Sequence, residues 1–165
     1  MLRGLALTMT LVFAFGLPAS AAELGGDISK LAEPFNEKAK ALHYDVRIEL
    51  RDCTTNALPI CLYLINGGDL LAARSGPDKV TVNQVGLFLV KMDPSNLRNY
   101  ATALVNLVAM YIPDAKVSEI TVLFSMLNAQ IGVGQKTAEM EIHGIKVKIG
   151  VVPGIGIVSG IARAP

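Results

Sequence analysis

Two cysteines are the residues whose type and spacing most directly predict chemistry in this chain. Cys53 and Cys61 are its only cysteines, and the turn-favouring residues Asn56 and Pro59 lie between them. The spacing lacks the C-x-x-C of a redox motif, and two cysteines do not complete a zinc site. The pair therefore predicts a disulfide, because small exported chains with an even number of cysteines commonly pair them.

The two histidines, His43 and His143, are the next candidates for acid–base or metal chemistry. Asp45 follows His43 by two positions, and Glu141 precedes His143 by two. Residues two apart on a strand share a face, so Glu141 and His143 form a weak candidate metal site. Structural roles are the favoured interpretation: a helix end for His43 and a turn for His143. We predict no metal and no cofactor.

Two glycine-containing segments match nucleotide-binding motifs only in part. In residues 132–137, Gln135 separates the second glycine from the lysine, whereas a P-loop needs them adjacent. In residues 154–159, Ser159 stands where a dinucleotide-binding motif has its third glycine. The favoured interpretations are a helix end followed by a strand for the first segment, and a bulged strand for the second.

Small polar side chains recur every three or four residues along two segments with helical periodicity, which places each set on one helix face. The favoured interpretation is a solvent-facing surface, and the alternative is a polar binding surface or a self-association seam. The residues are Asn99, Thr102 and Asn106, then Ser118, Thr121, Ser125 and Asn128.

The elements that must position these side chains follow from the hydrophobic periodicity. Residues 28–42 predict a helix with Asp27 as its N-cap, and Pro34 predicts either a kink or a late start. Residues 44–51 alternate as a half-buried strand, with Tyr44, Val46, Ile48 and Leu50 on the apolar face. Further strands are predicted at residues 60–65 and 70–74. Residues 79–91 predict a strand pair or one strand interrupted at Gly86.

A helical hairpin and a β-hairpin are predicted in the second half of the chain. Asp93 and Pro94 are typical of a helix start, and a second helix over residues 117–131 is ended by Gly132. Residues 137–149 alternate about a turn at His143 and Gly144. That turn pairs Glu141 with Lys146, Glu139 with Lys148, Ile142 with Ile145, and Met140 with Val147. Residues 151–162 predict a final strand with a bulge.

The order of these elements predicts an α+β fold. An antiparallel β-sheet carries an N-terminal helix and a central helical hairpin packed on one face, and one disulfide ties the fold. Residues 22–165 have the length of a single domain.

The first 21 residues predict a secretory signal peptide. Arg3 precedes an apolar run over residues 5–17, and Ala19-Ser20-Ala21 supplies a cleavage site before Ala22. An uncleaved anchor is the alternative, but the run is shorter than the ~20 residues of a membrane span. No Asn-x-Ser/Thr sequence occurs, which fits a bacterial periplasmic or secreted protein.

Composition narrows the function classes. The chain has 165 residues, of which 52% are apolar and 18% charged, with a net charge of +1. These values exclude a disordered tail and argue against a nucleic-acid-binding arm. After the leader no apolar stretch is long enough to predict a membrane span.

Three functions remain open from the sequence. The leading hypothesis is an exported, non-enzymatic protein that binds a protein partner. The first alternative is a carrier that holds an apolar small ligand or lipid between the sheet and the helices, because both layers are rich in aliphatic residues. The second alternative is a hydrolase whose groups, such as Glu49, Asp52 or the histidines, are brought together only by folding. No catalytic residue is predicted.

Overall fold

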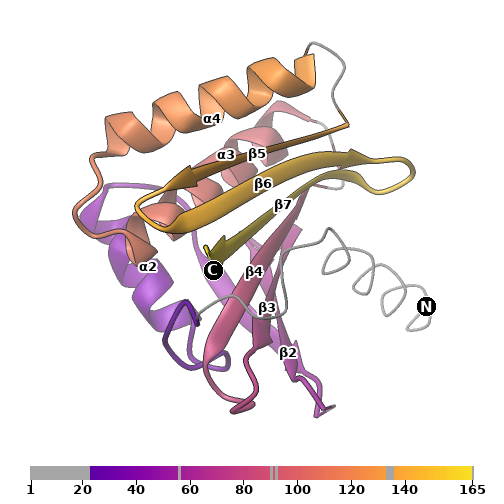
Figure 1. Cartoon of the computed structure of the whole chain (residues 1–165). Coiled ribbons are helices and arrows are strands. Elements are labelled where there is room, and N and C mark those ends of the chain that lie inside the picture. The colour runs from indigo at the N-terminus through magenta and orange to yellow at the C-terminus, as the bar shows by residue number, and fades with distance from the viewer. Residues whose placement is uncertain (1–22, 56, 90, 92, 133–135, 165) are drawn as a thin grey trace.

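The computed structural model describes residues 23–55, 57–89, 91, 93–132 and 136–164. The predicted signal peptide, residues 1–21, lies outside the described residues. Within them, a seven-stranded antiparallel sheet is accompanied by three helices (Figure 1). The predicted α+β class is confirmed. None of the described helices is both long and apolar enough to cross a membrane.

The elements follow one another as one helix, four strands, two helices and three strands. The helices are α2 (Ala32–Ala41), α3 (Pro94–Tyr111) and α4 (Val117–Gly132). The strands are β1 (Ile48–Cys53), β2 (Ile60–Ile65), β3 (Asp69–Ser75), β4 (Val82–Leu89), β5 (Thr137–Ile142), β6 (Ile145–Val152) and β7 (Gly156–Arg163). In the sheet the order is β1-β2-β3-β4-β7-β6-β5, so β1 and β5 form its two edges.

The helices form one layer on one face of the sheet. The helix α2 contacts β1, α3 contacts β2 and β4, and α4 lies over β5 (Figure 1). Alternate strand residues such as Tyr63, Leu87 and Ile161 face this layer and share its core. A smaller apolar cluster, which includes Leu62 and Phe88, comes from the intervening strand positions.

The helical hairpin begins and ends where the sequence predicts. The Asp93 carboxylate accepts hydrogen bonds from the backbone N–H groups of Ser95 and Asn96, at 3.0 and 2.9 Å. Pro94 occupies the first turn, where its missing N–H costs no helical hydrogen bond. Asp93 is therefore the N-cap of α3.

The first helix starts later than the periodicity alone predicts. The structure begins α2 at Ala32, so Pro34 lies in the first turn and introduces no kink. Asp27 is not its N-cap: this carboxylate accepts from the backbone N–H and the hydroxyl of Ser29, at 2.8 and 2.7 Å. The late-start interpretation of Pro34 is thus confirmed, and the capping role predicted for Asp27 is wrong.

The first strand is displaced from its predicted position, because side-chain amides bind the segment that precedes it. Asn66 accepts from the Arg47 N–H at 2.8 Å and donates to the Asp45 carbonyl at 3.1 Å. Asn36 of α2 bonds both backbone groups of Ile48, at 2.9 and 3.0 Å. Regular pairing therefore starts at Ile48, and the register shifts after Leu50, which is 46% exposed. The predicted burial of Leu50 is wrong.

The remaining strands confirm the register of one hairpin and correct the last strand. All four predicted cross-strand pairs of β5 and β6 are present. The Glu139 carboxylate meets Lys146 at 3.0 Å and Lys148 at 3.9 Å.

A single strand β4 runs through Gly86, without interruption. The predicted bulge in the final strand is wrong, because its pairing with β6 and β4 is continuous. The glycines Gly154 and Gly156, both with positive φ, serve the β6–β7 turn instead.

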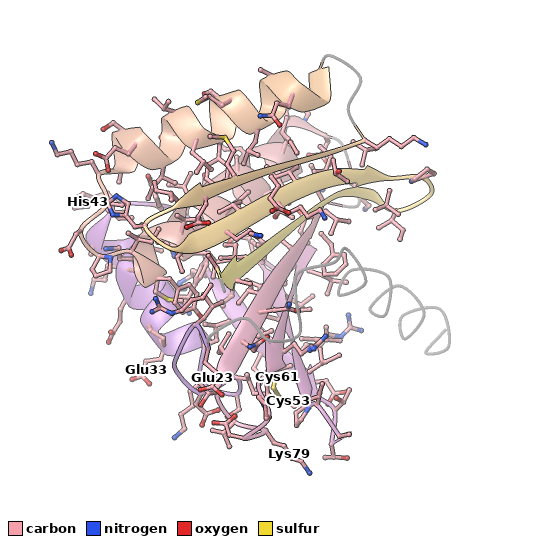
Figure 2. The ribbon with its side chains drawn as sticks, viewed as in Figure 1. Glu23, Glu33, His43, Cys53, Cys61 and Lys79 are labelled. Atoms are coloured by element: carbon pink, nitrogen blue, oxygen red, sulfur yellow. A yellow bond between two sulfur atoms is a disulfide. The ribbon has the colours of Figure 1, made fainter. Side chains whose placement is uncertain are left out.

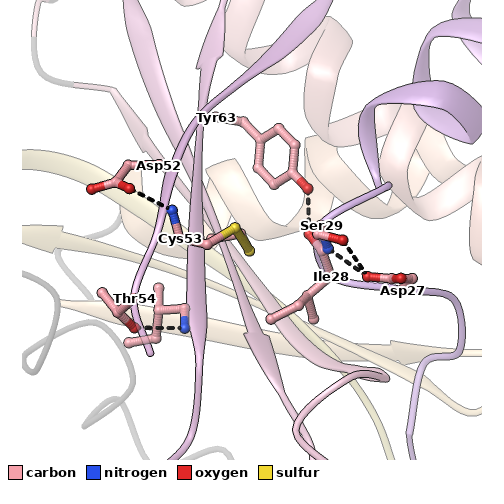
Figure 3. The surroundings of a disulfide bond; sticks show 9 residues. Asp27, Ile28, Ser29, Asp52, Cys53, Thr54 and Tyr63 are labelled. Carbon is pink, nitrogen blue, oxygen red and sulfur yellow. Dashed lines mark hydrogen bonds between the residues drawn. A yellow bond between two sulfur atoms is a disulfide. The ribbon is translucent and has the colours of Figure 1, made fainter. Parts of the chain in front are cut away.

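The predicted disulfide joins two directly opposed residues. Cys53 at the end of β1 pairs with Cys61 at the start of β2, and their Cα atoms are 4.1 Å apart. Figure 3 shows the bond close to the 27–29 segment and to Tyr63, whose hydroxyl donates to the Ile28 carbonyl. The disulfide thus fastens an edge strand to the sheet next to the segment that leads into α2.

Replacing both cysteines with serine is expected to lower the free energy of unfolding by about 2–3 kcal/mol, because the short closed loop restricts the unfolded chain. The corresponding fall in Tm is roughly 5–10 °C. Thermal unfolding of the oxidised, reduced and doubly substituted chains measures the effect. Equal Tm values for the oxidised and reduced chains would contradict the stabilising role.

Candidate functional site

A cavity of about 250 Å³ lies between the helical hairpin and the sheet. The helix α3 contributes Leu97, Tyr100 and Leu104, and α4 contributes Phe124 with two hydroxyl residues. Its floor is formed by Ile149 of β6 and Ile157 of β7. Ligand sites in proteins are typically concave and largely apolar, with a few polar groups. This arrangement makes the cavity the candidate binding site.

The cavity is open on the helix side and closed by the sheet. Leu97 is 46% exposed, and Ala101, Thr121 and Ser125 are also exposed, so the entrance lies between the two helices. By contrast, Ile149 and Tyr100 are almost completely buried. A molecule that entered between α3 and α4 would therefore lose contact with water as it reached the sheet.

The hydroxyls at the entrance are already hydrogen-bonded within their own helix. Thr121 Oγ1 donates to the Val117 carbonyl at 2.8 Å, and Ser125 Oγ donates to the Thr121 carbonyl at 3.0 Å. Serine and threonine hydroxyls commonly satisfy themselves in this way on a helix. The entrance is therefore less polar than its residue types indicate.

The polar stripe that the sequence predicts is divided between solvent and core. Ser118, Thr121 and Ser125 are exposed, as the favoured interpretation requires. Asn106 contradicts it, because this side chain is fully buried and its amide donates to the Phe35 carbonyl of α2 at 2.9 Å. Periodicity places a residue on a helix face but does not identify which helix will cover that face.

Two residues with buried hydroxyls, Tyr100 in the lining and Ser159 next to it, lie beside the cavity. Tyr100 is 5% exposed and Ser159 is 1% exposed. Ser159 pairs directly with Ile149 and follows Ile157 by two positions, which puts its side chain on the cavity face of β7. Neither hydroxyl makes a hydrogen bond of normal geometry. Burial raises the pKa of Tyr100, and the adjacent Ser159 hydroxyl offsets only part of this shift.

Two further tyrosines, the buried Tyr63 and the partly buried Tyr111, lie outside the cavity lining. Burial raises the pKa of Tyr63 to about 12, and its hydroxyl is bonded to Ile28 (Figure 3). Tyr111, on the same helix as Tyr100, also has a raised pKa because of burial, and its hydroxyl has no hydrogen-bond partner within the described residues. Tyr111 therefore provides a matched comparison for Tyr100.

A second cavity, of about 350 Å³, lies between α2 and the segment before β1. Four exposed charged residues of both signs line it: Glu37, Lys40, Asp45 and Arg47. The Asn36 amide, which also lines it, is already bonded to Ile48. This cavity has no excess of one charge and is the weaker candidate.

The acidic residues and histidines considered from the sequence lie outside the main cavity. Glu49 and Asp52 are exposed on β1, and Asp52 accepts from the neighbouring Cys53 N–H at 2.8 Å. His43 is exposed and lies well away from the disulfide (Figure 2), and His143 is exposed in the β5–β6 turn. In the part of the chain that the structure describes, His, Cys, Asp and Glu form no group of three that could hold a metal ion.

Sequence reasoning missed the residues of the main cavity. It did not single out Tyr100, and it considered Ser159 only as part of a partial nucleotide-binding motif. One signal was present: Ser159 interrupts the inward-facing aliphatic series Ile157 and Ile161. A hydroxyl in such a series indicates a polar position in the core, because buried polar groups normally need a hydrogen-bond partner.

Searches of protein-family models, of curated proteins and of solved structures find no match to this chain. The structure itself shows an α+β domain with a small, mainly apolar cavity between its helices and its sheet.

The buried phenol of Tyr100 leads to a pH-dependent prediction. Its folded-state pKa lies above the ordinary value of about 10, so the unfolded chain releases the proton first as the pH rises. Its contribution to stability is complete below pH 10 and is lost above it, by up to about 1.4 kcal/mol per pH unit. We expect Tyr100→Phe to lessen this loss and to leave stability at pH 7 unchanged or higher.

Urea unfolding at pH 7, 9, 10 and 11 measures this effect, and Tyr111→Phe is expected to behave in the same way. The account of the Tyr100 environment would be wrong if Tyr100→Phe destabilised the chain at pH 7. The account would also be contradicted if, above pH 10, the free energy of unfolding fell equally steeply with pH in the wild type and in Tyr100→Phe.

Proposed function

We propose that this chain is a carrier that holds a small apolar molecule between its helical hairpin and its sheet. The observation that supports the proposal is the cavity of about 250 Å³, with Leu104, Phe124, Ile149 and Ile157 among its walls. An apolar cavity of about 150 Å³ accepts benzene, so this one has room for a somewhat larger molecule. Burial of the apolar surface of the ligand supplies the binding free energy.

Binding of a protein partner has less support than the carrier function. Most of the exposed large apolar side chains stand on separate elements, such as Leu50 on β1 and Val151 on β6. Val122 and Met126, one turn apart on α4, are 58% and 50% exposed. Isolated apolar side chains are common on protein surfaces, whereas a cavity concentrates apolar contacts at one point.

The proposal places the carrier outside the cytoplasm. The predicted signal peptide supports this location, and the Cys53–Cys61 disulfide adds weak support because such bonds persist in oxidising compartments. The exported chain is then expected to begin at Ala22. An exported chain whose mass included residues 1–21 would contradict the cleavage.

The carrier function is tested with p-xylene, a small apolar probe, in thermal unfolding. At about ten times its Kd, the probe is expected to raise the Tm of the wild type by roughly 3–5 °C, because it binds only the folded chain. Val105→Phe places a larger side chain in the cavity lining and is expected to abolish this rise. Val122→Phe makes the same change at an exposed site on α4 and is expected to preserve it.

Each variant is compared with itself, with and without the probe, so that a change in its own stability does not enter the result. Absence of a p-xylene effect in the wild type would overturn the carrier function. An equal rise in wild type and Val105→Phe would show that the probe binds elsewhere, which also contradicts the proposal.

A further inference from the structure

The cavity has an apolar lining, and two buried hydroxyls lie beside it. The rings and aliphatic chains that line it offer dispersion contacts. The hydroxyl of Tyr100, a lining residue, and the hydroxyl of Ser159, next to it on β7, make no hydrogen bond of normal geometry. Burying a hydroxyl without a partner is unfavourable, because its bonds to water are lost and not replaced. A ligand that offered one oxygen at this point would replace them.

We propose that the ligand of this cavity is a neutral small molecule with an apolar body and a single hydroxyl, of the phenol or short alcohol class. Its hydroxyl oxygen hydrogen-bonds with the Tyr100 hydroxyl, and its apolar body contacts Leu104, Phe124 and Ile149. This inference rests on the proposed carrier function and specifies its ligand.

The lack of charged side chains among the described lining residues favours a neutral ligand. No lining residue in the described part of the chain carries a charge. Typical lining residues are Leu97, Tyr100, Thr121, Phe124 and Ile149. A carboxylate or phosphate buried here would lose its hydration without gaining a cation. Fatty acids and phospholipid headgroups are therefore poor candidates.

The size of the cavity limits the ligand further. Because about 150 Å³ accepts benzene, a cavity of about 250 Å³ suits a single ring with one or two small substituents, or a short chain. A lipid with two acyl chains is far too large. The ligand class is thus set by three features: the volume, the absence of charge in the lining, and the unpaired hydroxyls.

The test uses two probes of nearly equal shape, p-cresol and p-xylene, which differ by a hydroxyl in place of a methyl group. Their Kd values are measured by titration calorimetry on the wild type, Tyr100→Phe and Tyr111→Phe. Tyr100→Phe is expected to weaken p-cresol binding about fivefold, the effect of one lost neutral hydrogen bond, and to leave p-xylene binding unchanged or tighter. Ser159→Ala is expected to weaken p-cresol binding in the same direction.

Tyr111→Phe removes the same atoms from the same helix outside the cavity lining, and is expected to change neither Kd. If p-xylene binds but Tyr100→Phe leaves the Kd of p-cresol unchanged, the hydroxyl inference is overturned and the carrier function stands. If Tyr111→Phe weakens p-cresol as much as Tyr100→Phe does, the inference is also overturned. If p-xylene does not bind the wild type, the carrier function itself fails.

Discussion

The burial of α3 is the constraint on which the rest of the structure depends. This helix contacts α2 on one side, α4 on the other and the strands β2 and β4 beneath. Ala103 and Leu107 are completely buried, and Asn106 ties α3 to α2 through the Phe35 carbonyl. Since α3 covers the centre of the sheet, α4 lies over the edge strand β5. The candidate cavity is the space that remains between α3, α4 and the strands below them.

The sequence predicted those elements in which neighbouring residues determine the structure. Asp93 is the N-cap of α3, the helix that directly follows it. The His143-Gly144 turn aligns the glutamates of β5 with the lysines of β6. The start of α2 was predicted less well, because Asp27 bonds to Ser29 and not to the helix. Residues 44–47 alternate like a strand, yet the amide of Asn66, distant in sequence, binds their backbone. Such partners become neighbours only after folding, and one sequence does not reveal them.

The candidate site was harder to predict than the fold, because a cavity is a property of packing between distant elements. The sequence offered the space between sheet and helices only as one alternative, the place of an apolar ligand, and that alternative stays a proposal. The residues were not: Tyr100 has the spacing of an ordinary core residue, and Ser159 lies more than fifty positions later. Only the pairing of β7 with β6 places Ser159 beside the cavity floor. The ligand class proposed here, but not the carrier function, depends on that juxtaposition of two buried hydroxyls with apolar walls.

The most direct measurement of the central claim is a crystal structure of the chain soaked with 4-iodophenol, in which anomalous scattering locates the iodine. The account predicts an iodine peak between α3 and α4, with the phenol oxygen within hydrogen-bond distance of the Tyr100 hydroxyl. An iodine peak only on the outer surface, or a cavity closed by repacking of Leu97 and Phe124, would contradict the account.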